Sequence, residues 1–283
     1  MSNAFTAYRD ENGSPLVRQS IVGFLDILGF SQVSTSCRTL EDSQAVLDKI
    51  AAAIDESRKH VRDYFAESDH ARQPWSLKFF SDNLVLGLPI DHGDANTDSA
   101  IEFVLRCTQR YQLSMALRGY FVRGALTQGP LCLTDEIIFG SALVESYQLE
   151  SKASIVPRVV LTEPLQQLVS QASDRAGSAA ALKSLICRDV DGWWFVNYLQ
   201  VAATPRGVEW EVIRRHKESI LDSLSRTTRH DVLPKYGWAC RYHNVFCHWH
   251  RNAPGYADAY RIDRADEHSS IHCLGDSGAA AAV

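Results

Sequence analysis

Residues 20–30 read SIVGFLDILGF, an almost unbroken apolar run that contains a single carboxylate, Asp26. A run of this kind is typical of a strand that is buried on both faces in the middle of a sheet. A carboxylate inside such a strand is costly unless a cation or several hydrogen-bond donors stabilise it. The stretch therefore predicts the central strand of the fold, and Asp26 is the first residue for which we expect a function.

The segments after this strand alternate between helical and strand patterns. The motif Thr39-Leu-Glu-Asp42 is a capping signal for an amphipathic helix, whose apolar positions include Leu47. The polar triplet Ser81-Asp82-Asn83 predicts a tight hairpin between two short strands. The expected order is strand, helix, strand, strand, helix, strand, over residues 20–30, 39–65, 76–80, 84–88, 99–119 and 120–129. This βαββαβ order predicts an α+β fold of the ferredoxin-like type, with helices on one face of an antiparallel sheet.

Beyond residue 130 the patterns extend the sheet and end in helices. We expect a helix over 140–151, strands over 156–161 and 193–198, and mostly helix over 208–252. The predicted organisation is an N-terminal segment over 1–19, a main domain over 20–200, a helical extension of that domain over 201–274, and a disordered tail over 275–283.

The composition limits the classes of partner. A net charge of −5 provides no positive field for a nucleic acid, although it does not exclude a small anion in a local basic pocket. The seven cysteines include no C-x-x-C pair, which predicts reduced thiols in a cytoplasmic protein. Residues 1–20 lack the apolar core of a signal peptide, and no stretch approaches the roughly 18 apolar residues of a membrane span. We therefore expect no nucleic acid and no membrane among the partners.

Asp26 and Asp82 form the first candidate site. The strand order lets the central strand lie beside the hairpin that carries Asp82. Paired carboxylates on neighbouring strands supply the hard oxygen ligands that Mg²⁺ and Mn²⁺ prefer. The alternative is that Asp26 caps the end of its strand and Asp82 only forms the turn. The cost of a charge inside an apolar strand favours the metal site.

Two basic residues accompany these carboxylates. Arg123 lies in the predicted strand YFVRGALTQG, residues 120–129, whose glycines permit the close approach of a ligand or of neighbouring backbone. A guanidinium there suits a triphosphate; the alternative is an edge-strand arginine whose head group reaches solvent. Lys78 either pairs with Asp82, four residues later, or points to a ligand.

A third group lies near the C-terminus. Cys240, His243 and Cys247 would share one helical face and could bind zinc. The same stretch carries several aromatic residues, so packing of an aromatic helix is the simpler interpretation. Gly-x-Ser-x-Gly and P-loop motifs do not occur, which argues against serine hydrolases and P-loop enzymes.

The ordered motifs resemble those of a known enzyme family. FLDILGF, Lys78-Phe-Phe-Ser-Asp82, Arg123-Gly-Ala-Leu-Thr-Gln-Gly129 and Phe139-Gly140 at a helix start are similar to the motifs of class III nucleotidyl cyclases, over roughly residues 20–162. More narrowly, FLDILGFS, Ser146-Tyr-Gln-Leu-Glu-Ser151, Pro157-Arg-Val-Val, DVDGWWFVNYL and KYGWACRYHN resemble the Pycsar pyrimidine cyclases of bacterial antiphage defence.

The resemblance implies roles for individual residues. Asp26 and Asp82 fall on the family's two metal-binding aspartates, with the backbone carbonyl of Ile27 as an expected further ligand for two Mn²⁺ or Mg²⁺ ions. Arg123 falls on the arginine that contacts the triphosphate. Lys78 falls on a lysine that reads the base, which in such homodimers comes from the opposite protomer.

The sequence departs from adenylate cyclases at several positions. Ile137 stands where that family has an aspartate that accepts a hydrogen bond from the adenine amine, and isoleucine cannot accept one. Val144 and Gln148 stand where it has an asparagine and the transition-state arginine. Arg158 is the first candidate for a cation that replaces this arginine.

These observations together predict a homodimeric uridylate cyclase that converts UTP to 3′,5′-cyclic UMP and pyrophosphate, with a separate effector that reads the product. CTP is the nearest alternative substrate. The expected catalytic residues are Asp26, Asp82, Arg123 and Arg158, and the expected substrate-binding residues are Lys78, Phe80, Tyr147 and Gln148. Two other hypotheses stay open: a catalytically silent nucleotide-sensing module, and a purine cyclase with an unusual base pocket.

Overall fold

The computed structural model describes residues 6–30, 34–35, 37–66, 76–80, 83–90, 94–174, 182–227, 229–262 and 272–273. Asp82 and the tail predicted over 275–283 lie outside the described residues, and Phe80 is described only in its backbone. The strands are β1 (Arg18–Ile27), β2 (Ser76–Phe80), β3 (Asn83–Pro89), β4 (Val122–Leu133), β5 (Ile138–Phe139), β6 (Val159–Leu161), β7 (Ile186–Arg188), β8 (Trp194–Val196), β9 (Ala203–Thr204), β10 (Gly207–Val208) and β11 (His272–Cys273). The helices are η1 (Thr6–Tyr8), α2 (Leu40–Ala66), α3 (Asp94–Ala116), α4 (Ser141–Ala153), α5 (Glu163–Asp174), η3 (Tyr198–Ala202), α7 (Trp210–Arg226), α8 (Leu233–Trp249) and η4 (Asp258–Tyr260).

The first four strands form the predicted ferredoxin-like core. They stand in the order β4-β1-β3-β2, and β1 is antiparallel to both of its neighbours. Helices α2 and α3 connect β1 to β2 and β3 to β4, which is the split βαβ arrangement. Beyond β4 the sheet continues through β6, β8, β7 and β11, and β5 pairs with β4 beside this path. The prediction of an α+β fold with an extended sheet is confirmed.

The apolar run around Asp26 forms the central strand because its side chains pack on both faces. Val22 and Phe24 pack on one face of the sheet, and Ile21 and Leu25 on the other. The neighbouring strand needs a glycine where it passes β1: a Cβ on Gly124 would lie 2.4 Å from the carbonyl oxygen of Phe24. This close approach explains the glycine that follows Arg123.

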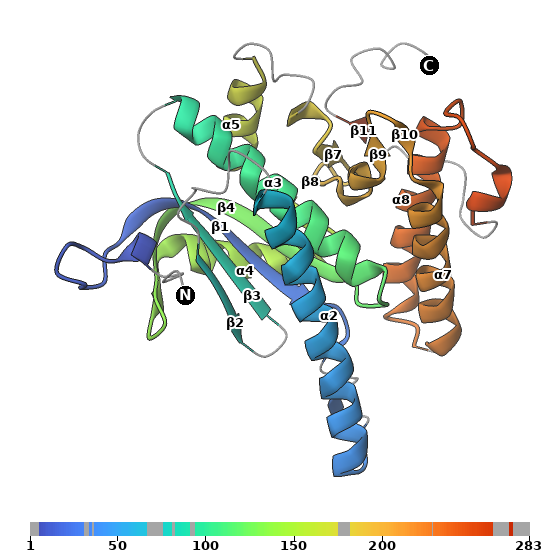
Figure 1. Ribbon diagram of the computed structural model, residues 1–283, viewed down its shortest axis with the longest axis horizontal. Helices are drawn as coiled ribbons and strands as arrows, with labels where there is room; N and C mark the ends of the chain where they lie inside the picture. The colour runs from blue at the N-terminus through green and yellow to red at the C-terminus, as the bar shows by residue number, and fades with distance from the viewer. Residues whose placement is uncertain are drawn as a thin grey trace.

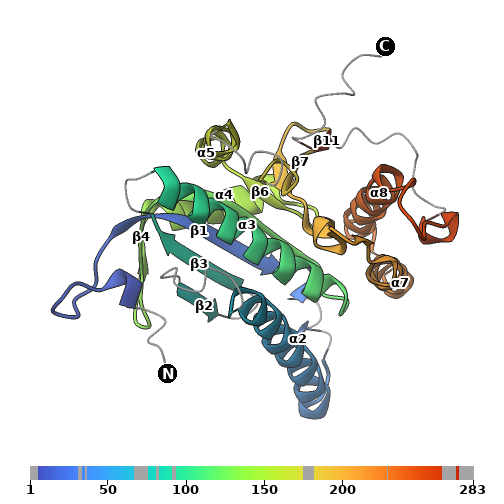
Figure 2. The ribbon, with the colours of Figure 1, turned by 45° about the horizontal axis from the view of Figure 1, so that its top comes forward.

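The two helices of the βαββαβ unit, α2 and α3, lie on one face of the sheet as predicted, and α4, which follows that unit, lies on the other face. Figure 1 and Figure 2 show α2 and α3 in front of β1, β3 and β4, and α4 behind them. Helix α4 packs against β1 and β4 through Ala142, which belongs to the cluster of Phe24 and Leu131. The candidate residues Asp26 and Arg123, which lie on this face, are therefore partly covered by a helix of this chain.

Several boundaries differ from the sequence prediction. The capping box is present: Thr39 Oγ1 accepts from the Asp42 amide at 3.0 Å and the Thr39 amide donates to Asp42 Oδ2 at 3.2 Å. Leu47 was expected on the inner face but is exposed, because the first turns of α2 extend beyond the sheet. Helix α3 begins at Asp94 instead of Ser99.

The C-terminal helices share a core with the sheet. Trp238 and Phe246 of α8 belong to the same buried cluster as Ala125 of β4 and Phe195 of β8. The aromatic side chains of α8 thus face inward. Among the described helices, none is both long enough and apolar enough to span a membrane.

Candidate active site

The structure pairs Asp26 with Arg123. The two residues are direct partners across β1 and β4. Both Nε and Nη2 of Arg123 lie 2.8 Å from Oδ2 of Asp26. Arg123 was considered as an edge-strand arginine, but β4 lies between β1 and β6 in the sheet. Its head group is held instead by a carboxylate of the neighbouring strand, and both side chains remain partly exposed.

A second carboxylate, which the sequence interpretation did not assign, completes the cluster. Glu150 of α4 places Oε1 2.8 Å from Nη2 of Arg123, although its side chain is only 4% exposed. Apart from this ion pair, the oxygen has no hydrogen-bond partner among the described atoms. The signal was present in the sequence: the buried face of α4 is Ala142, Ser146, Glu150 and Ala153, a stripe of small residues interrupted by one carboxylate. A charge at such a position indicates a partner across the interface.

The expected second metal ligand, Asp82, lies outside the described residues. Its neighbour in the chain, Asn83, is the first residue of β3 and the direct partner of Asp26 across β1 and β3. Position 83 therefore stands one strand away from Asp26, a spacing of about 5 Å in a sheet. The pairing of Asp26 with Asp82 stays a prediction.

Lys78 lies on β2, and its ammonium contacts the turn between β4 and β5. Nζ donates to the carbonyl oxygens of Asp135 at 2.7 Å and Thr134 at 3.3 Å. Lys78 is the register partner of Val85, which packs in the same cluster as Phe24, so its side chain belongs to the α4 face. The structure thus brings Lys78 to the loop just before Ile137.

The aromatic residues expected around a base divide between the two faces of the sheet. Tyr147 of α4 packs edge-to-face on Phe24, with ring centroids 5.5 Å apart, and is itself exposed. Gln148, the next residue of α4, and Phe139 of β5 are also exposed. Phe79 lies on the opposite face, where its ring contacts Tyr111 of α3, because alternate residues of a strand point to opposite faces.

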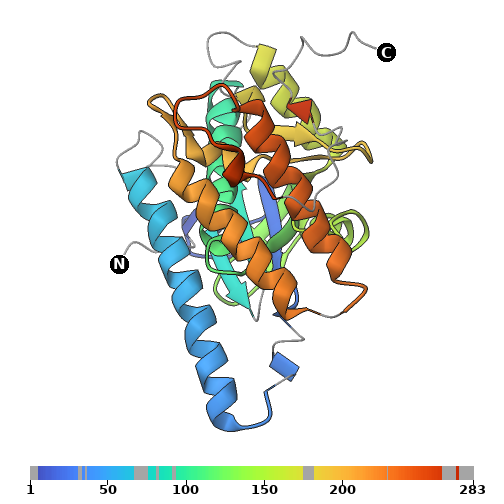
Figure 3. The same cartoon turned by 90° about the vertical axis from the view of Figure 1, so that its right-hand side faces the viewer.

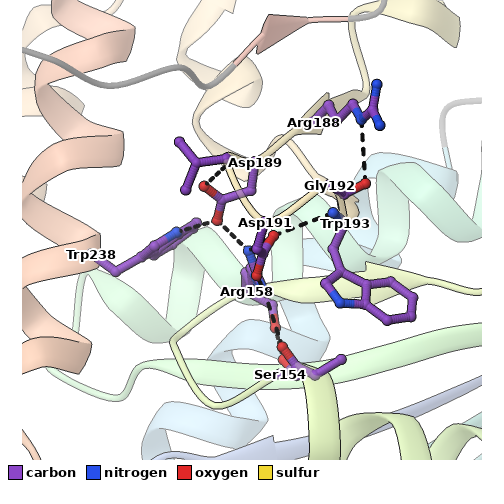
Figure 4. A network of polar contacts seen from close by, with 10 residues as sticks. Ser154, Arg158, Arg188, Asp189, Asp191, Gly192, Trp193 and Trp238 are labelled. Atoms are coloured by element: carbon purple, nitrogen blue, oxygen red, sulfur yellow. Dashed lines mark hydrogen bonds and ion pairs between the residues drawn. The ribbon is translucent and has the colours of Figure 1, made fainter.

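Arg158 does not join the cluster of Asp26. Its guanidinium is buried and donates to Asp189, to Asp191 and to the carbonyl oxygen of Ala153, as Figure 4 shows for the two carboxylates. Trp238 of α8 donates to the same oxygen of Asp189 at 2.6 Å. The expectation that Arg158 reaches a phosphate conflicts with this arrangement, because both Nη atoms already donate to partners in the β7–β8 turn and at the end of α4.

The cysteine and histidine residues of α8 lie in a buried hydrogen-bond chain. His243 Nε2 lies 2.8 Å from the carbonyl oxygen of Tyr260, and its Nδ1 lies 3.0 Å from Nδ1 of His216. His216 Nε2 lies 2.9 Å from the hydroxyl of Tyr198. A carbonyl oxygen only accepts, so neutral His243 carries its proton on Nε2 and donates it to Tyr260. Nδ1 of His243 then accepts from Nδ1 of His216, and Nε2 of His216 accepts from the hydroxyl of Tyr198. Burial lowers the pKa of His243 to about 4 and also lowers that of His216.

This chain of contacts bears on the zinc hypothesis. Cys247 Sγ lies 3.7 Å from His243 Nε2, and both side chains are buried. Within the described part of the chain, no group of three His, Cys, Asp or Glu side chains is arranged to hold a metal ion. His243 therefore has a structural role that explains its burial.

Comparisons with known proteins give likenesses of fold. The chain is similar to the adenylyl cyclase CyaB from P. aeruginosa, with a TM-score of 0.43 and 16% identity over 64% of this chain and 94% of that one. It is also similar to the guanylyl cyclase Cya2, with a TM-score of 0.41 and 11% identity over 64% of this chain and 92% of that one. A third likeness is to an adenylate/guanylate cyclase/hydrolase from Silicibacter pomeroyi, with a TM-score of 0.39 and 17% identity over 64% of this chain and 97% of that one. No protein-family model matches the chain, and no curated protein matches its sequence.

Proposed function

We propose that this protein is a metal-dependent nucleotidyl cyclase that works as a homodimer and converts UTP to 3′,5′-cyclic UMP and pyrophosphate. The observation that carries the proposal is the cluster of Asp26, Arg123 and Glu150. It offers a carboxylate for a cation and a guanidinium for a phosphate side by side, opposite the residue that follows Asp82. As the resemblance to the Pycsar enzymes implies, the product would serve as a second messenger for a separate effector in antiphage defence.

The donor set suits a hard divalent cation. Two carboxylates against one guanidinium leave the cluster with one formal negative charge. Asp26 would hold Mg²⁺ or Mn²⁺, with Asp82 and the carbonyl of Ile27 as expected further ligands. Bound ions of this kind lower the pKa of the ribose 3′-hydroxyl and neutralise the triphosphate.

Arg123 is placed to exchange one partner for another. Its two nitrogens both contact Asp26, and Nη2 also contacts Glu150. A phosphate that takes the place of Asp26 would leave the guanidinium still held by Glu150. Arg123 then forms charge-assisted hydrogen bonds to the pyrophosphate leaving group, where negative charge develops. Glu150 acts through Arg123 and is a positioning residue.

The homodimer is supported by apolar side chains that the single chain leaves exposed. Ile137 precedes β5, Phe139 ends it, and Val144 and Tyr147 lie on α4; each is 45% to 62% exposed. Ile137 and Phe139 follow closely on the turn that Lys78 contacts. A second copy on this surface would cover them and bring its own base-reading groups to the site. The mass of the protein in solution tests this part of the proposal.

A specific observation favours a second candidate, the catalytically silent nucleotide sensor. Val144 and Gln148, which replace the family's asparagine and arginine, carry no positive charge, and Arg158 is committed to Asp189 and Asp191. A site with Arg123 as its cation could bind a nucleotide without stabilising the transition state. Turnover therefore separates the two candidates.

The test is to incubate the purified protein with Mn²⁺ and each of the four nucleoside triphosphates, and to identify products by mass. Cyclic UMP confirms the proposal, cyclic CMP shifts it to CTP, and a cyclic purine nucleotide overturns the pyrimidine assignment. A protein that gains thermal stability from a nucleotide but forms no product is the sensor. Neither product nor stabilisation overturns both candidates.

A further inference from the structure

A second pocket lies on the face of the sheet opposite to the cluster of Asp26. Its volume is about 1020 Å³, and it lies between α2, the turn of residues 117–120, α7 and the start of α8. Figure 3 looks onto this side of the molecule, with α2, α7 and α8 all in view. Ile27 lines the pocket and packs in the cluster of α2 and α3, whereas Asp26 pairs with Arg123, which in turn contacts Glu150 of α4. The two sites therefore share the end of β1 but open on different faces.

The pocket is positively charged in a chain whose net charge is −5. Five basic residues and three acidic residues line it: Lys49, Arg118, Arg215, Arg226, Lys235, Glu56, Glu218 and Asp222. Each of the three acids already has an arginine partner. Glu56 pairs with Arg118, and Asp222 pairs with Arg226. Glu218 pairs with an arginine outside the pocket, so the lining keeps an excess of positive charge.

Three of these cations come from three different helices and have no ion-pair partner. Lys49 lies on α2, Arg215 on α7 and Lys235 on α8. Across the described part of the chain, none of the three forms an ion pair within 4.0 Å. Arg215 lies within electrostatic reach of Glu56 and Glu211, and Lys235 within reach of Asp231, but none of these contacts is an ion pair within 4.0 Å. Like charges gathered around one cavity repel one another unless an anion joins them.

The remaining lining is apolar and aromatic. Tyr120 and Tyr236 contribute rings, and Ile27, Ile50 and Val232 contribute aliphatic side chains. Tyr236 is fixed edge-to-face against Phe121, with ring centroids 5.4 Å apart. Cations together with aromatic walls suit a ligand that combines an anionic group with a flat ring. A volume of this order is that of a small-molecule or cofactor site.

We infer that this pocket binds a nucleotide through its phosphate, independently of divalent metal, at a site separate from the cluster of Asp26. Lys49, Arg215 and Lys235 contact the phosphate, and Tyr120 and Tyr236 contact the ring. The binding does not depend on the proposed cyclase activity. Where that activity is present, a ligand in this pocket contacts Ile27 and so affects the position of Asp26, the preceding residue of the same strand.

The experiment is calorimetric titration of the full-length protein in excess EDTA with AMP, adenosine and inorganic pyrophosphate. We expect AMP to bind with a Kd below about 1 mM, and adenosine to bind at least about tenfold more weakly because the cations have no anion to contact. Pyrophosphate measures the contribution of the charge alone and should bind more weakly than AMP. Equal binding of AMP and adenosine, or no saturable binding of AMP, overturns the inference.

A matched pair of variants assigns the binding to this pocket. Arg215→Gln with Lys235→Gln should weaken AMP binding at least about tenfold. Arg206→Gln removes an exposed charge from the β9–β10 turn, outside the pocket, and should leave the affinity unchanged. Far-ultraviolet circular dichroism checks that all variants are folded. Equal loss in both proteins would show that the binding is a nonspecific effect of charge.

A third variant separates this inference from the proposed function. Asp26→Ala should keep metal-independent AMP binding, because Asp26 does not line the pocket. Binding that appears only with Mn²⁺ and is lost in Asp26→Ala would overturn the inference and support the active site instead. Binding in EDTA with no cyclic product from any triphosphate would support the pocket and count against the cyclase.

Discussion

Two arginines of this chain are each held by two carboxylates, yet their surroundings differ. Arg123 lies between Asp26 and Glu150, and its side chain is 25% exposed. Arg158 contacts Asp189 and Asp191, and its side chain is 3% exposed. An ion pair at a solvent-accessible position can exchange one partner for a ligand, whereas a buried pair cannot do so without leaving a charge without compensation. The same chemistry therefore suits a binding site in one region and a structural link in the other.

The elements that supply the partners explain this difference. Arg123 and Asp26 lie near the end of the β1–β4 pair, against which α4 packs. The partners of Arg158 come from the β7–β8 turn, and Trp238 of α8 closes over Asp189. Burial would raise the pKa of Asp191, but its hydrogen bonds to Arg158 and the charge of that residue outweigh burial and lower it. The contact with Arg158 thus favours the ionised form of Asp191.

The largest expected effect is on turnover at the accessible cluster. Asp26→Ala should lower kcat with Mn²⁺ and UTP by at least about 10⁴-fold, equivalent to more than about 5 kcal/mol of barrier, because it removes the carboxylate that holds the cation. The free energy of unfolding should change by less than about 1.5 kcal/mol, since Arg123 keeps Glu150. Urea titration and product assays measure the two quantities.

Asp48→Ala is the matched control for this change. Asp48 is an exposed aspartate of α2 whose side chain accepts a hydrogen bond from Gln44. It should keep wild-type turnover and stability. Near-normal turnover in Asp26→Ala would show that the metal assignment is wrong.

The next largest effect is on stability at the buried cluster. Arg158→Met should lower the free energy of unfolding by about 3–5 kcal/mol, because Asp189 loses its cation while it stays buried. Arg214→Ala removes an exposed arginine that pairs with Glu211 and Glu218 and should cost less than about 1 kcal/mol. Urea denaturation compares the two variants. Similar small losses in both would remove the contrast between accessible and buried clusters.

Glu150 tests whether the accessible cluster includes a positioning residue. Glu150→Gln should raise KM for the triphosphate or lower kcat by about tenfold to a hundredfold, because Arg123 loses the charge that holds it once Asp26 binds a cation. Glu150→Asp should restore part of the loss, since it keeps the charge. Glu145→Gln changes another α4 carboxylate, which accepts from Thr127 at 2.6 Å, and should have a smaller effect. An equal effect of both substitutions would indicate disturbance of α4 as a whole.

The smallest expected effect is the pH dependence of stability that arises from the buried histidines of α7 and α8, His216 and His243. The folded-state pKa of His243 is about 4, below its ordinary value of 6.5. At pH values between these two, the unfolded chain therefore binds more protons than the folded chain. The stabilisation is complete above about pH 6.5 and falls as the pH drops toward 4, by about 2 kcal/mol at about pH 5. His216 shifts in the same direction. Urea titrations at about pH 7.5 and 5 measure the loss.

Two variants locate this dependence. His243→Asn should flatten the pH dependence of stability, even if the variant is less stable at both pH values. His248→Ala changes an exposed histidine of the same helix and should leave the dependence as it is. An unchanged slope in His243→Asn would show that another group is protonated.

Most of the fold could be predicted from the sequence because local patterns carry it. The apolar run around Asp26, the capping box at Thr39 and the antiparallel pair of β2 and β3 each depend on neighbouring residues and proved correct. The face that α4 covers could not be predicted in the same way. A helix after β5 can return to either side of a sheet, and only the packing of Ala142 on Phe24 and Leu131 selects one.

The candidate site was predictable only in part. Asp26 and Arg123 were identified separately, but their ion pair depends on the register between β1 and β4, 97 residues apart. Glu150 was missed because its partner lies on another element. Arg158 was expected at a phosphate because a sequence shows a charge without showing that two carboxylates already surround it.

The sequence by itself determined the βαββαβ order, the central strand and the residue types available for chemistry, because these depend on periodicity, turns and the cost of a charge in an apolar run. Only the tertiary structure decided which charges meet. Ion pairs form across strand registers and helix faces, and the positions of those surfaces follow from the packing of the whole core, not from any single stretch of chain.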